Sequence, residues 1–377
     1  MPAADIQVVA SYLGVKPAGR ATGTPIKIGG VSSDAGPQSD PAQALAWRNA
    51  IQLINTEMGG VQGHPLELAL CDFGASAQQG QICGSRFAND SATKAVLFTG
   101  GNTGAPEMVA ANNGSKAYFC TAASPGYTDA KNMFCTQGGA LTLPAVVTYV
   151  ADYVKAKSVS LLSIGAPALE AIINSQAPVY SKTGIKTTTA FSPPGATSVT
   201  STLVAGKIQS TEAAELVLPA PSFCPPYVNG IKTLGVKSPV ISLNTCLDPS
   251  VVKAVGIPSF TFLEAGPSFD LPDPTGQTQV FRDAANAYGD ASGANSAQAF
   301  GTVLLMVKIM NEIGADHLTT EALSAKMSAY TDGLFLGDPA LKFGVQPYPS
   351  VGSVRARFFT HHADGTWTDA TGGKWVG

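Results

Sequence analysis

The sequence predicts an α/β fold made of two doubly wound parallel-sheet lobes. Two observations favour this fold: a strand–helix–strand unit over residues 26–72, and two successive sets of alternating strands and helices further along the chain. The chain has 377 residues, which is long for one domain and sufficient for two, each with its own core. Strands that alternate with helices in this way form parallel sheets with helices on their faces.

The strand–helix–strand unit begins with an apolar stretch at residues 26–31, followed by a loop rich in Ser, Asp, Gly and Pro. Asp40 stands where a helix N-cap is expected, and Pro41 occupies the first helical position, where its missing N–H costs nothing. Apolar residues follow at helical spacing until a Gly-Gly pair at 59–60 ends the helix. Residues 66–70 then carry Leu at every second position, as in a strand. Two strands joined by a helix of this length form a right-handed parallel unit.

The later strands and helices fall into two groups. Strands predicted at 94–98 and 116–121 continue the first lobe, and a second alternating set begins near residue 145. Helices predicted at 277–288 and 297–313 exceed what the second lobe needs. We therefore expect the chain to cross back and complete the first lobe.

Composition and charge exclude several classes of partner. The formal net charge is −3, so there is no electrostatic attraction to nucleic acid or to an anionic membrane surface. Only 13% of the residues are charged, against about 25% in an average soluble domain, which suits an exported protein. No apolar run approaches the ~20 residues that span a bilayer. Residues 1–4 lack the basic and apolar segments of a signal peptide, so we expect the mature form of an exported protein.

The six cysteines predict disulfides rather than a metal site. They fall into three close pairs: Cys71/Cys83, Cys120/Cys135 and Cys224/Cys246. Six cysteines allow fifteen connectivities, and we expect nearest-neighbour pairing because each pair links nearby elements. A zinc site fits less well, since the sequence has no C-x-x-C pair and its four histidines are scattered. Oxidised cysteines favour a location outside the cytoplasm, and six buried thiols in a cytosolic protein are the alternative.

Short motifs along the chain resemble those of a known family. Pro-Ile-Lys-Ile-Gly stands at 25–29, Ala-Ile-Gln-Leu-Ile-Asn at 50–55, and Gly-Gly-Val-Gln-Gly-His-Pro-Leu-Glu-Leu at 59–68. Further on, a predicted helix at 298–313 precedes a Phe-Phe-Thr-His-His-Ala-Asp-Gly-Thr-Trp segment at 358–367. In this order and spacing the motifs resemble the periplasmic or extracellular solute-binding proteins of ABC importers. The type that they resemble most is the leucine/isoleucine/valine-binding type, which has the type I periplasmic binding fold.

The resemblance extends over residues 25–369. It implies two lobes joined by a three-strand hinge, with the third crossing near residues 334–337. Residues 1–24, which show no strong period, are predicted to form an extended and partly mobile arm. The predicted domains are 1–24 for the N-terminal arm, 25–143 with 268–335 for lobe 1, and 144–267 with 336–377 for lobe 2.

The resemblance also implies a function. The chain is expected to capture a small molecule between its lobes and to deliver it to the permease of an ABC importer. We expect an extracytoplasmic monomer that binds no nucleic acid and uses no cofactor or metal. The same fold also serves ligand-sensing domains in signalling or regulation, and the sequence leaves that alternative open.

An enzyme is not expected, because the sequence lacks the common catalytic motifs. It contains no G-x-S-x-G elbow, no H-E-x-x-H and no G-x-G-x-x-G after a strand. His361 and His362 are adjacent, so on a strand their rings point to opposite faces and do not share one site easily. Asp364-Gly365 is a hairpin-turn signal, and we interpret this segment as a surface hairpin.

The candidate ligand site lies in loops that directly follow strands, because ligands of open α/β sheets bind at the carboxyl ends of strands. Small residues at 99–104 let the backbone approach a ligand at a helix N-terminus, which favours an anionic or carbonyl group. In 122–127, Ser124 can donate a hydrogen bond and Tyr127 can pack on an apolar ligand. An ordinary glycine-rich turn and a Pro-Gly turn beside a disulfide are the structural alternatives. The candidates in lobe 1 are Ser39, in the loop after the first strand, and Gly100, Gly101, Asn102, Thr103, Ala123, Ser124 and Tyr127.

Three strand ends of lobe 2 offer equivalent positions, at residues 165–167, 219–221 and 244–245. The amide and hydroxyl at 244–245 can recognise a ligand without charge or cap the next helix. Glu264 ends the strand that leads into the hinge, where a structural ion pair is favoured over a ligand contact. The candidates in lobe 2 are Pro167, Ala220, Asn244 and Glu264.

The resemblance sharpens the prediction of the ligand. Amino-acid binders of this family clamp the ligand carboxylate with hydroxyls that correspond here to Asn102/Thr103 and Ser124/Pro125. They hold the ammonium group with an acid whose position falls at or beside Asn244, and they place aromatic residues near Ser39 and Ala168. The acid and much of the aromatic lining are therefore missing. Because a buried ammonium without a carboxylate costs several kcal/mol, we expect a small neutral or anionic metabolite, such as an amino-acid-like compound, an amide or an aromatic acid.

Overall fold

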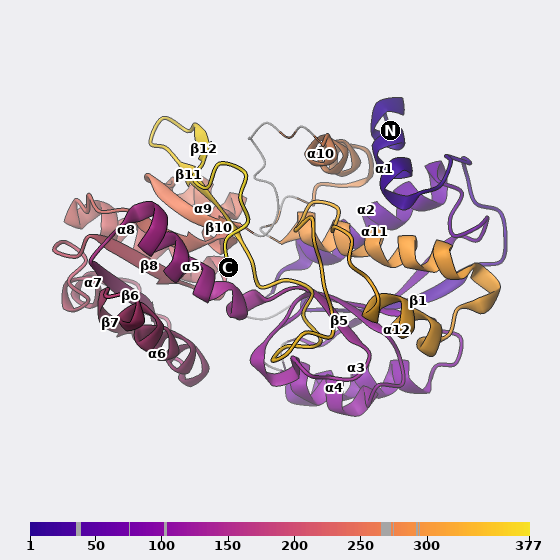
Figure 1. The fold of residues 1–377 in the computed structure, drawn as a ribbon, viewed down its shortest axis with the longest axis horizontal. Coiled ribbons are helices and arrows are strands. Elements are labelled where there is room, and N and C mark those ends of the chain that lie inside the picture. Colours follow the sequence, from indigo (N-terminus) through magenta and orange to yellow (C-terminus); the bar gives the residue numbers. More distant parts are fainter. Residues whose placement is uncertain are drawn as a thin grey trace. The chain divides into compact units, whose positions relative to one another are not determined.

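The computed structural model describes most of the 377-residue chain. The described residues are 1–34, 39–74, 76–101, 104–264, 273, 275–291, 293 and 295–377. They form two compact units. Unit 1 comprises Met1–Leu141 and Pro272–Val354, and unit 2 comprises Thr142–Leu271 and Arg355–Gly377. The chain thus passes three times from one unit to the other (Figure 1).

Unit 1 is built on a five-stranded parallel sheet with the order β2-β1-β3-β4-β5. Its strands are β1 (Ile26–Ser32), β2 (Leu66–Asp72), β3 (Val96–Phe98), β4 (Tyr118–Ala122) and β5 (Met133–Gln137). Its longer helices are α1 (Ala3–Leu13), α2 (Pro41–Glu57), α3 (Ala77–Asn89), α4 (Ala105–Asn112), α10 (Gln277–Tyr288), α11 (Ser296–Ile313) and α12 (Thr320–Ser328). Short 3-10 turns are η1 (Pro125–Tyr127), η2 (Gly139–Thr142) and η6 (Ala315–His317).

Helices cover both faces of the unit 1 sheet, as a doubly wound fold requires. A methyl group added at Gly29 would meet Phe87 of α3, whereas one added at Gly30 would meet Trp47 of α2. Since neighbouring residues of β1 face opposite sides, α3 and α2 lie on opposite faces. Figure 1 shows α4 beside α3 on one side, and α11 beside α2 on the other.

Unit 2 contains a seven-stranded sheet with the order β12-β11-β10-β9-β8-β6-β7. Strands β6 to β10 are parallel, and β11 and β12 add an antiparallel hairpin at one edge. The strands are β6 (Ser158–Ile164), β7 (Lys186–Ser192), β8 (Ala213–Val217), β9 (Val240–Leu243), β10 (Phe260–Glu264), β11 (Arg357–His361) and β12 (Trp367–Asp369). The predicted surface hairpin around Asp364-Gly365 is therefore confirmed.

Two separate apolar clusters show that the sheet of unit 2 is also covered on both faces. One cluster involves α5 (Leu143–Tyr149) and α6 (Pro167–Lys182), and the other involves α7 (Thr200–Ala205), α8 (Cys224–Leu234) and α9 (Pro249–Val255). The π-helical turn η3 (Val150–Val154) extends α5, and the 3-10 turns η4 (Pro221–Phe223) and η5 (Asn244–Leu247) follow strands β8 and β9. The prediction of two doubly wound α/β units is confirmed.

The structure corrects the prediction for residues 1–24. Instead of an extended arm, residues Ala3–Leu13 form helix α1, which packs against α10 and α11. The side chains of Val9, Ala10 and Leu13 are buried, so this segment belongs to the core of unit 1. The apolar stripe is short and the residue before the helix is Pro2, which provides no side-chain cap, so the sequence signal is weak.

The third crossing also lies further along the chain than predicted, between Val354 and Arg355. Residues 336–354 stay with unit 1, and residues 350–352 of this segment pair with β5. Cys135 donates its N–H to the carbonyl of Ser350, and Gly352 donates to the carbonyl of Cys135. Strand β5 is not among the predicted elements.

Candidate functional site

The three predicted disulfides are confirmed, and they share a location. Cys71–Cys83, Cys120–Cys135 and Cys224–Cys246 have Cα–Cα distances of 5.8, 4.3 and 5.5 Å. Cys71 is the next-to-last residue of β2, and Cys246 lies in η5, directly after β9. Cys120 and Cys135 face each other in the paired strands β4 and β5, two residues before the end of each strand. All six sulfurs are buried. The bridges therefore stabilise the carboxyl edges of the two sheets, where the candidate loops begin.

The strand orders define where these edges can bind a ligand. In both sheets the first strand of the unit lies between the second and the third, so the order reverses between β1 and β3 and between β6 and β8. Ligands of such sheets bind beside this reversal, at the carboxyl ends of the strands. The loops that follow β3, β4, β6, β8 and β9 contain most of the predicted site residues. The fold thus brings the lobe 1 candidates to one edge of one sheet and the lobe 2 candidates to one edge of the other.

The loop after β3 lies close to the loop after β4. Gly100 has φ +91°, and a Cβ atom there would be 2.5 Å from the carbonyl oxygen of Ala122. Only glycine fits this conformation and this close approach without a shift. Gly101 follows with φ +144° and donates its N–H to the hydroxyl of Tyr127 at 3.2 Å. Asn102 and Thr103 lie outside the described residues.

The structure corrects the predicted role of Tyr127. Its side chain is 1% exposed, at the end of η1, and its ring packs against Phe98 with centroids 5.8 Å apart. The hydroxyl lies 3.1 Å from the carbonyl oxygen of Ala122 and 3.2 Å from that of Gly101. Burial raises the pKa of Tyr127, so the hydroxyl stays protonated and can donate. This side chain is buried in the core and forms hydrogen bonds with the backbone of the two loops, so its ring does not offer an apolar face to a ligand.

The other candidates of unit 1 line the same edge. Ala123 and Ser124 are 5% and 7% exposed, and Ala123 donates its N–H to the carbonyl of Gln137 at 2.9 Å. Ser39 is partly buried just before Asp40, the residue at the N-cap position of α2. Asp40 gives that helix no side-chain capping bond, and its carboxylate instead accepts a hydrogen bond from Gln43 at 2.9 Å.

In unit 2, backbone hydrogen bonds and side chains connect the strand ends. Gly165 donates its N–H to the carbonyl of Ser192 at 2.7 Å, and Ser163 donates its hydroxyl to the carbonyl of Val217 at 2.6 Å. The buried hydroxyl of Tyr227 lies within hydrogen-bond distance of the Ser163 carbonyl and 3.0 Å from the Ser192 hydroxyl. The ends of β6, β7 and β8 are therefore held in one network.

The candidates of unit 2 lie around this network. Pro167 is the exposed first residue of α6, Ala220 is 4% exposed before η4, and Asn244 begins η5. Thr245 donates its hydroxyl to the carbonyl of Leu218 at 3.0 Å, which ties η5 to the loop after β8. The helix that follows η5 is capped by Asp248, whose carboxylate accepts the N–H of Ser250 at 2.9 Å. Glu264 pairs with Arg357 in the register of β10 and β11, and its side chain lies outside the description.

Two acidic residues at this edge of unit 1 were not predicted. Asp72 ends β2 and accepts the N–H groups of Asp34 at 3.1 Å and Gly74 at 2.9 Å. Burial is the main cause that raises the pKa of the Asp34 carboxyl, and Asp72 adds to it. Both residues stand at or just beyond a strand end, so the rule that located the other loops would also have located them.

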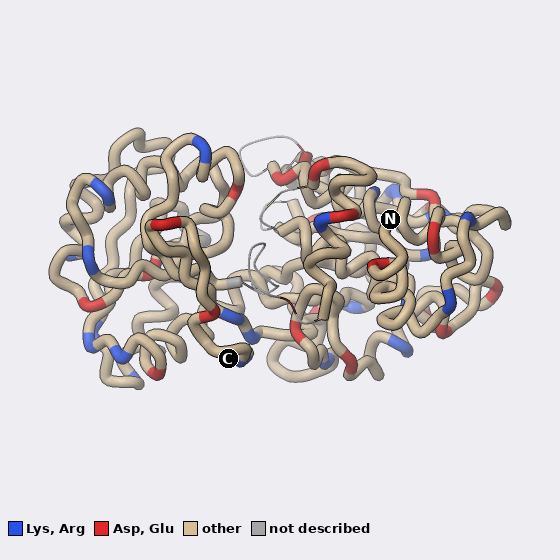
Figure 2. The backbone as a smooth tube through the Cα atoms, turned by 90° about the horizontal axis from the view of Figure 1, so that it is seen from above, with Lys and Arg blue, Asp and Glu red and all other residues tan. Residues whose placement is uncertain are grey.

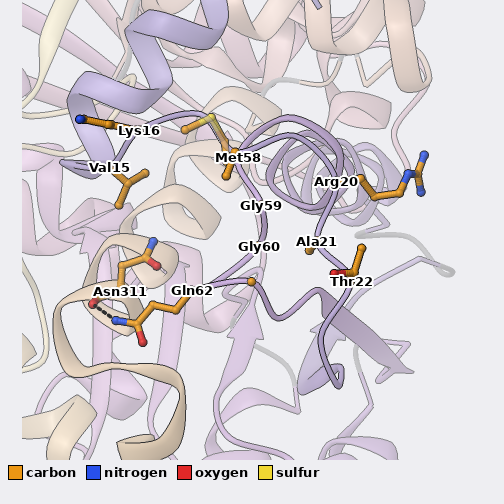
Figure 3. Close-up of a pocket in the computed structure, with 12 residues that line it drawn as sticks. Val15, Lys16, Arg20, Ala21, Thr22, Met58, Gly59, Gly60, Gln62 and Asn311 are labelled. Atoms are coloured by element: carbon orange, nitrogen blue, oxygen red, sulfur yellow. Dashed lines mark hydrogen bonds between the residues drawn. The ribbon is translucent and has the colours of Figure 1, made fainter.

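A surface pocket of about 420 Å³ occurs elsewhere in unit 1. It lies between the segment after α1, the turn from α2 to β2, and the end of α11 (Figure 3). This turn precedes β2, so the pocket is at the amino ends of the strands. The charged ends of Lys16 and Arg20 point away from its centre (Figure 3), and its lining contains none of the predicted site residues.

Charge is dispersed along the chain. Figure 2 shows that, in the described parts of both units, Lys and Arg are interspersed with Asp and Glu. Within the described ranges, no group of three or more His, Cys, Asp or Glu residues is arranged to hold a metal ion. A search of the same residues finds no helix with the length and apolar character needed to cross a membrane.

Two doubly wound sheets joined by three chain crossings are the architecture of the type I periplasmic binding fold. Comparison with protein families agrees: the model of the periplasmic binding protein family matches residues 25–343. The chain therefore belongs to the periplasmic binding proteins. Members of this family bind solutes outside the cytoplasm and are generally not enzymes, and three disulfides fit an oxidising compartment. A comparison with curated protein sequences finds no match.

Solved structures of ABC transporter substrate-binding proteins share the fold. The branched-chain amino acid binding protein LivJ from Streptococcus pneumoniae, in complex with isoleucine, is 15% identical with a TM-score of 0.74, over 91% of this chain and 98% of LivJ. A fatty acid ABC transporter substrate-binding protein from Thermomonospora curvata is 14% identical with a TM-score of 0.74, over 95% of this chain and 97% of that chain. A type 1 periplasmic binding protein from Bordetella pertussis is 16% identical with a TM-score of 0.74, over 92% and 100%.

Proposed function

We propose that this chain is the extracytoplasmic solute-binding component of an ABC importer, that it acts as a monomer without a cofactor, and that it hands its ligand to a membrane permease. The observation that carries the proposal is the coincidence of fold and loops. Both sheets reverse their strand order, and the candidate residues follow the strands on either side of those reversals. The family match over residues 25–343 supports the same role.

The proposed site uses loops from both units. Unit 1 contributes Ser39, Gly100, Gly101, Asn102, Thr103, Ala123 and Ser124, and unit 2 contributes Pro167, Ala220, Asn244 and Glu264. The N-terminus of α4, which follows the glycine loop, and the hydroxyl of Ser124 are suited to a carboxylate or carbonyl oxygen. Tyr127 is left out of the contact set because its side chain is buried beneath the loops.

The proposed ligand is a small neutral or anionic metabolite. Where amino-acid binders of the family place an acid for the ammonium group, the resemblance puts Asn244 of this chain. The carboxylate of the nearby Asp248 accepts hydrogen bonds from Ser250 at the start of α9. An amide recognises a carbonyl or hydroxyl without the cost of a buried charge, whereas a ligand ammonium there would lack a counter-charge. The neighbours include binders of isoleucine and of fatty acids, so both classes belong in the test.

A thermal-shift and calorimetry panel of L-leucine, benzoate, hexanoate and hexanamide tests the function and the ligand class together. We expect benzoate, hexanoate or hexanamide to bind in a 1:1 ratio without turnover and to stabilise the native state by about 2.7 kcal/mol at 100 times Kd. L-Leucine is expected to bind least tightly of the four. Tightest binding of L-leucine would contradict the ligand class alone, and turnover of any compound would contradict the function.

Ser124→Ala tests the site. Loss of one hydrogen bond to a charged or carbonyl ligand group is expected to weaken binding about tenfold. The matched control is Ser91→Ala, because Ser91 is exposed in the turn before β3, at the opposite edge of the same sheet. Equal affinities of Ser124→Ala and Ser91→Ala would show that the ligand does not contact this loop.

A further inference from the structure

The hydroxyl of Tyr127 touches two candidate loops at once. It accepts the N–H of Gly101, in the loop after β3, at 3.2 Å. It also lies 3.2 Å from the carbonyl oxygen of Gly101 and 3.1 Å from that of Ala122, at the end of β4. A phenol has one proton to donate and can accept in addition, so it satisfies the Gly101 N–H and one of the two carbonyls at any moment.

The surroundings leave this hydroxyl little freedom. The ring is 1% exposed and packs against Phe98, whose centroid lies 5.8 Å away. Phe98 ends β3, and Tyr127 ends the 3-10 turn that follows β4. The packing against Phe98 therefore fixes the ring relative to the sheet. The hydrogen bonds of the hydroxyl then hold the two loops at a fixed distance from that ring.

The two loops are closely spaced at this point. A Cβ atom on Gly100 would lie 2.5 Å from the carbonyl oxygen of Ala122, so the two backbones are in contact. Gly100 and Gly101 both have positive φ, which glycine adopts easily. Because glycine has no side chain, no side-chain packing holds this stretch of backbone in place. A loop of this kind keeps one geometry only if something outside it provides hydrogen bonds.

We propose that Tyr127 is a positioning residue, which sets the spacing between the loops after β3 and β4 and thereby the affinity for the ligand. The inference rests on the proposed function, because it assigns these loops to the ligand site. Tyr127 acts through the backbone of Gly101 and Ala122 and makes no contact with the ligand. Its loss changes binding more than it changes folding, since the phenyl ring and its packing remain in Tyr127→Phe.

Unit 1 offers a matched control in Tyr118. Tyr118 lies in β4 and is 0% exposed, and it belongs to the same core cluster as Tyr127. Among the residues that the structure describes, its hydroxyl has no hydrogen-bond partner. Tyr118→Phe therefore removes the same atom from the same core without removing a hydrogen bond. Any effect common to both variants reports loss of a buried hydroxyl, and any effect confined to Tyr127→Phe reports loss of the link between the loops.

The experiment measures two quantities on the full chain. The first is Kd for whichever of L-leucine, benzoate, hexanoate and hexanamide binds the wild type most tightly. The second is the hydrogen-exchange rate of the Gly101 amide, read by NMR without ligand. In Tyr127→Phe we expect Kd to rise about tenfold and Gly101 exchange to accelerate about tenfold, the effect of one buried hydrogen bond. In Tyr118→Phe both quantities stay within twofold of the wild type.

A Kd for Tyr127→Phe within twofold of the wild type overturns the proposal, and so does unchanged exchange at Gly101. If the wild type binds no compound of the panel, the proposed function fails, and the Gly101 exchange rate alone then decides whether Tyr127 positions the loop. Gly100→Ala is a second variant that separates the loops without touching the tyrosine. Weakened binding in Gly100→Ala together with wild-type binding in Tyr127→Phe would show that loop spacing matters and that Tyr127 does not set it, which also overturns the proposal.

Discussion

The carboxyl edges of the two sheets are held together by different means. In unit 1, the hydroxyl of Tyr127 joins the loops after β3 and β4. The disulfide Cys120–Cys135 lies within the sheet and joins the paired strands β4 and β5 before these loops begin. In unit 2, the disulfide Cys224–Cys246 joins the loops after β8 and β9 directly, and Thr245 adds a hydrogen bond to Leu218. One edge therefore depends on hydrogen bonds at its loops, and the other on a covalent bond.

The cores differ as well. Strand β8 of unit 2 carries Glu215, which is 1% exposed and accepts a hydrogen bond from the hydroxyl of Tyr180 at 2.6 Å. The side chain of Gln176 also lies beside this carboxyl and, like Tyr180, acts to lower its pKa. Burial raises the pKa of Glu215 to about 7, although the hydrogen bond from Tyr180 opposes this shift. Unit 2 thus combines a covalently fixed edge with a titratable group in its sheet, and the two properties can be separated by mutation.

The largest expected effect is the loss of Cys224–Cys246. Replacing both residues by Ala should lower the free energy of unfolding of unit 2 by about 3 kcal/mol, because the bridge closes a loop with a sequence separation of 22. Ala is preferred to Ser because both sulfurs are buried among apolar residues. Urea unfolding followed by hydrogen-exchange mass spectrometry assigns the loss of stability to peptides of one unit or the other.

The control for this prediction is the same change at Cys71 and Cys83. This bridge closes a separation of 12 and should cost a similar free energy, but in peptides of unit 1. Cys71–Cys83 connects β2 to α3 and joins no two candidate loops, so its removal should change ligand affinity less than removal of Cys224–Cys246. Equal destabilisation of both units by either double variant would contradict the view that each bridge stabilises its own unit.

The next effect concerns pH and Glu215. Folding raises the pKa of the Glu215 carboxyl from 4.5 to about 7. Such a group contributes its full stabilisation of the native state when the pH is below its pKa in the unfolded chain. That stability is lost as pH rises through the window between the two values. The contribution of Glu215 should therefore fall by about 2 to 3 kcal/mol between pH 5 and pH 8. Glu215→Gln should remove this dependence and be more stable than the wild type at pH 8.

Urea unfolding at pH 5 and pH 8 measures the difference between the wild type and Glu215→Gln, which cancels contributions from other groups. One such group is Asp5 of unit 1, whose pKa burial and the neighbouring Asp283 raise to about 6. Glu67→Gln is the control, because Glu67 is exposed on β2. If Glu215→Gln keeps the wild-type slope of stability against pH, the carboxyl is not the titrating group that distinguishes unit 2.

Much of the fold could be predicted because each element has a local signal. The predicted bounds of α10 agree with the structure residue for residue. The elements that were missed depend on distant partners. Strand β5 is held by the segment around Ser350, more than 200 residues away, and α1 is stabilised by burial against α10 and α11. Periodicity in a short window does not contain that information.

The positions of the candidate loops in the fold could be predicted from the sequence, but the direction of their side chains could not. The rule that ligands bind beyond strand ends selected the loops after β3 and β4 without any structure. Whether Tyr127 faces a ligand or the core depends on the conformation of the short turn that contains it. This turn is a three-residue 3-10 helix, and it directs the ring of Tyr127 into the core. Asp34 and Asp72 also stand at or just beyond strand ends, so the same rule identifies their positions from the sequence.

The smallest effect provides the sharpest test of the comparison. Thr245→Val removes the hydroxyl that donates to the Leu218 carbonyl at 3.0 Å and keeps the shape of the side chain. With Cys224–Cys246 intact, the two loops are already joined, so the variant should change ligand affinity less than twofold and stability by about 0.5 kcal/mol. In the background of the Cys224→Ala/Cys246→Ala variant the same hydroxyl is one of few remaining links, and its loss should cost about 1 kcal/mol more. Additive effects in this double-mutant cycle would mean that the covalent bond and the hydrogen bond do not hold the same pair of loops.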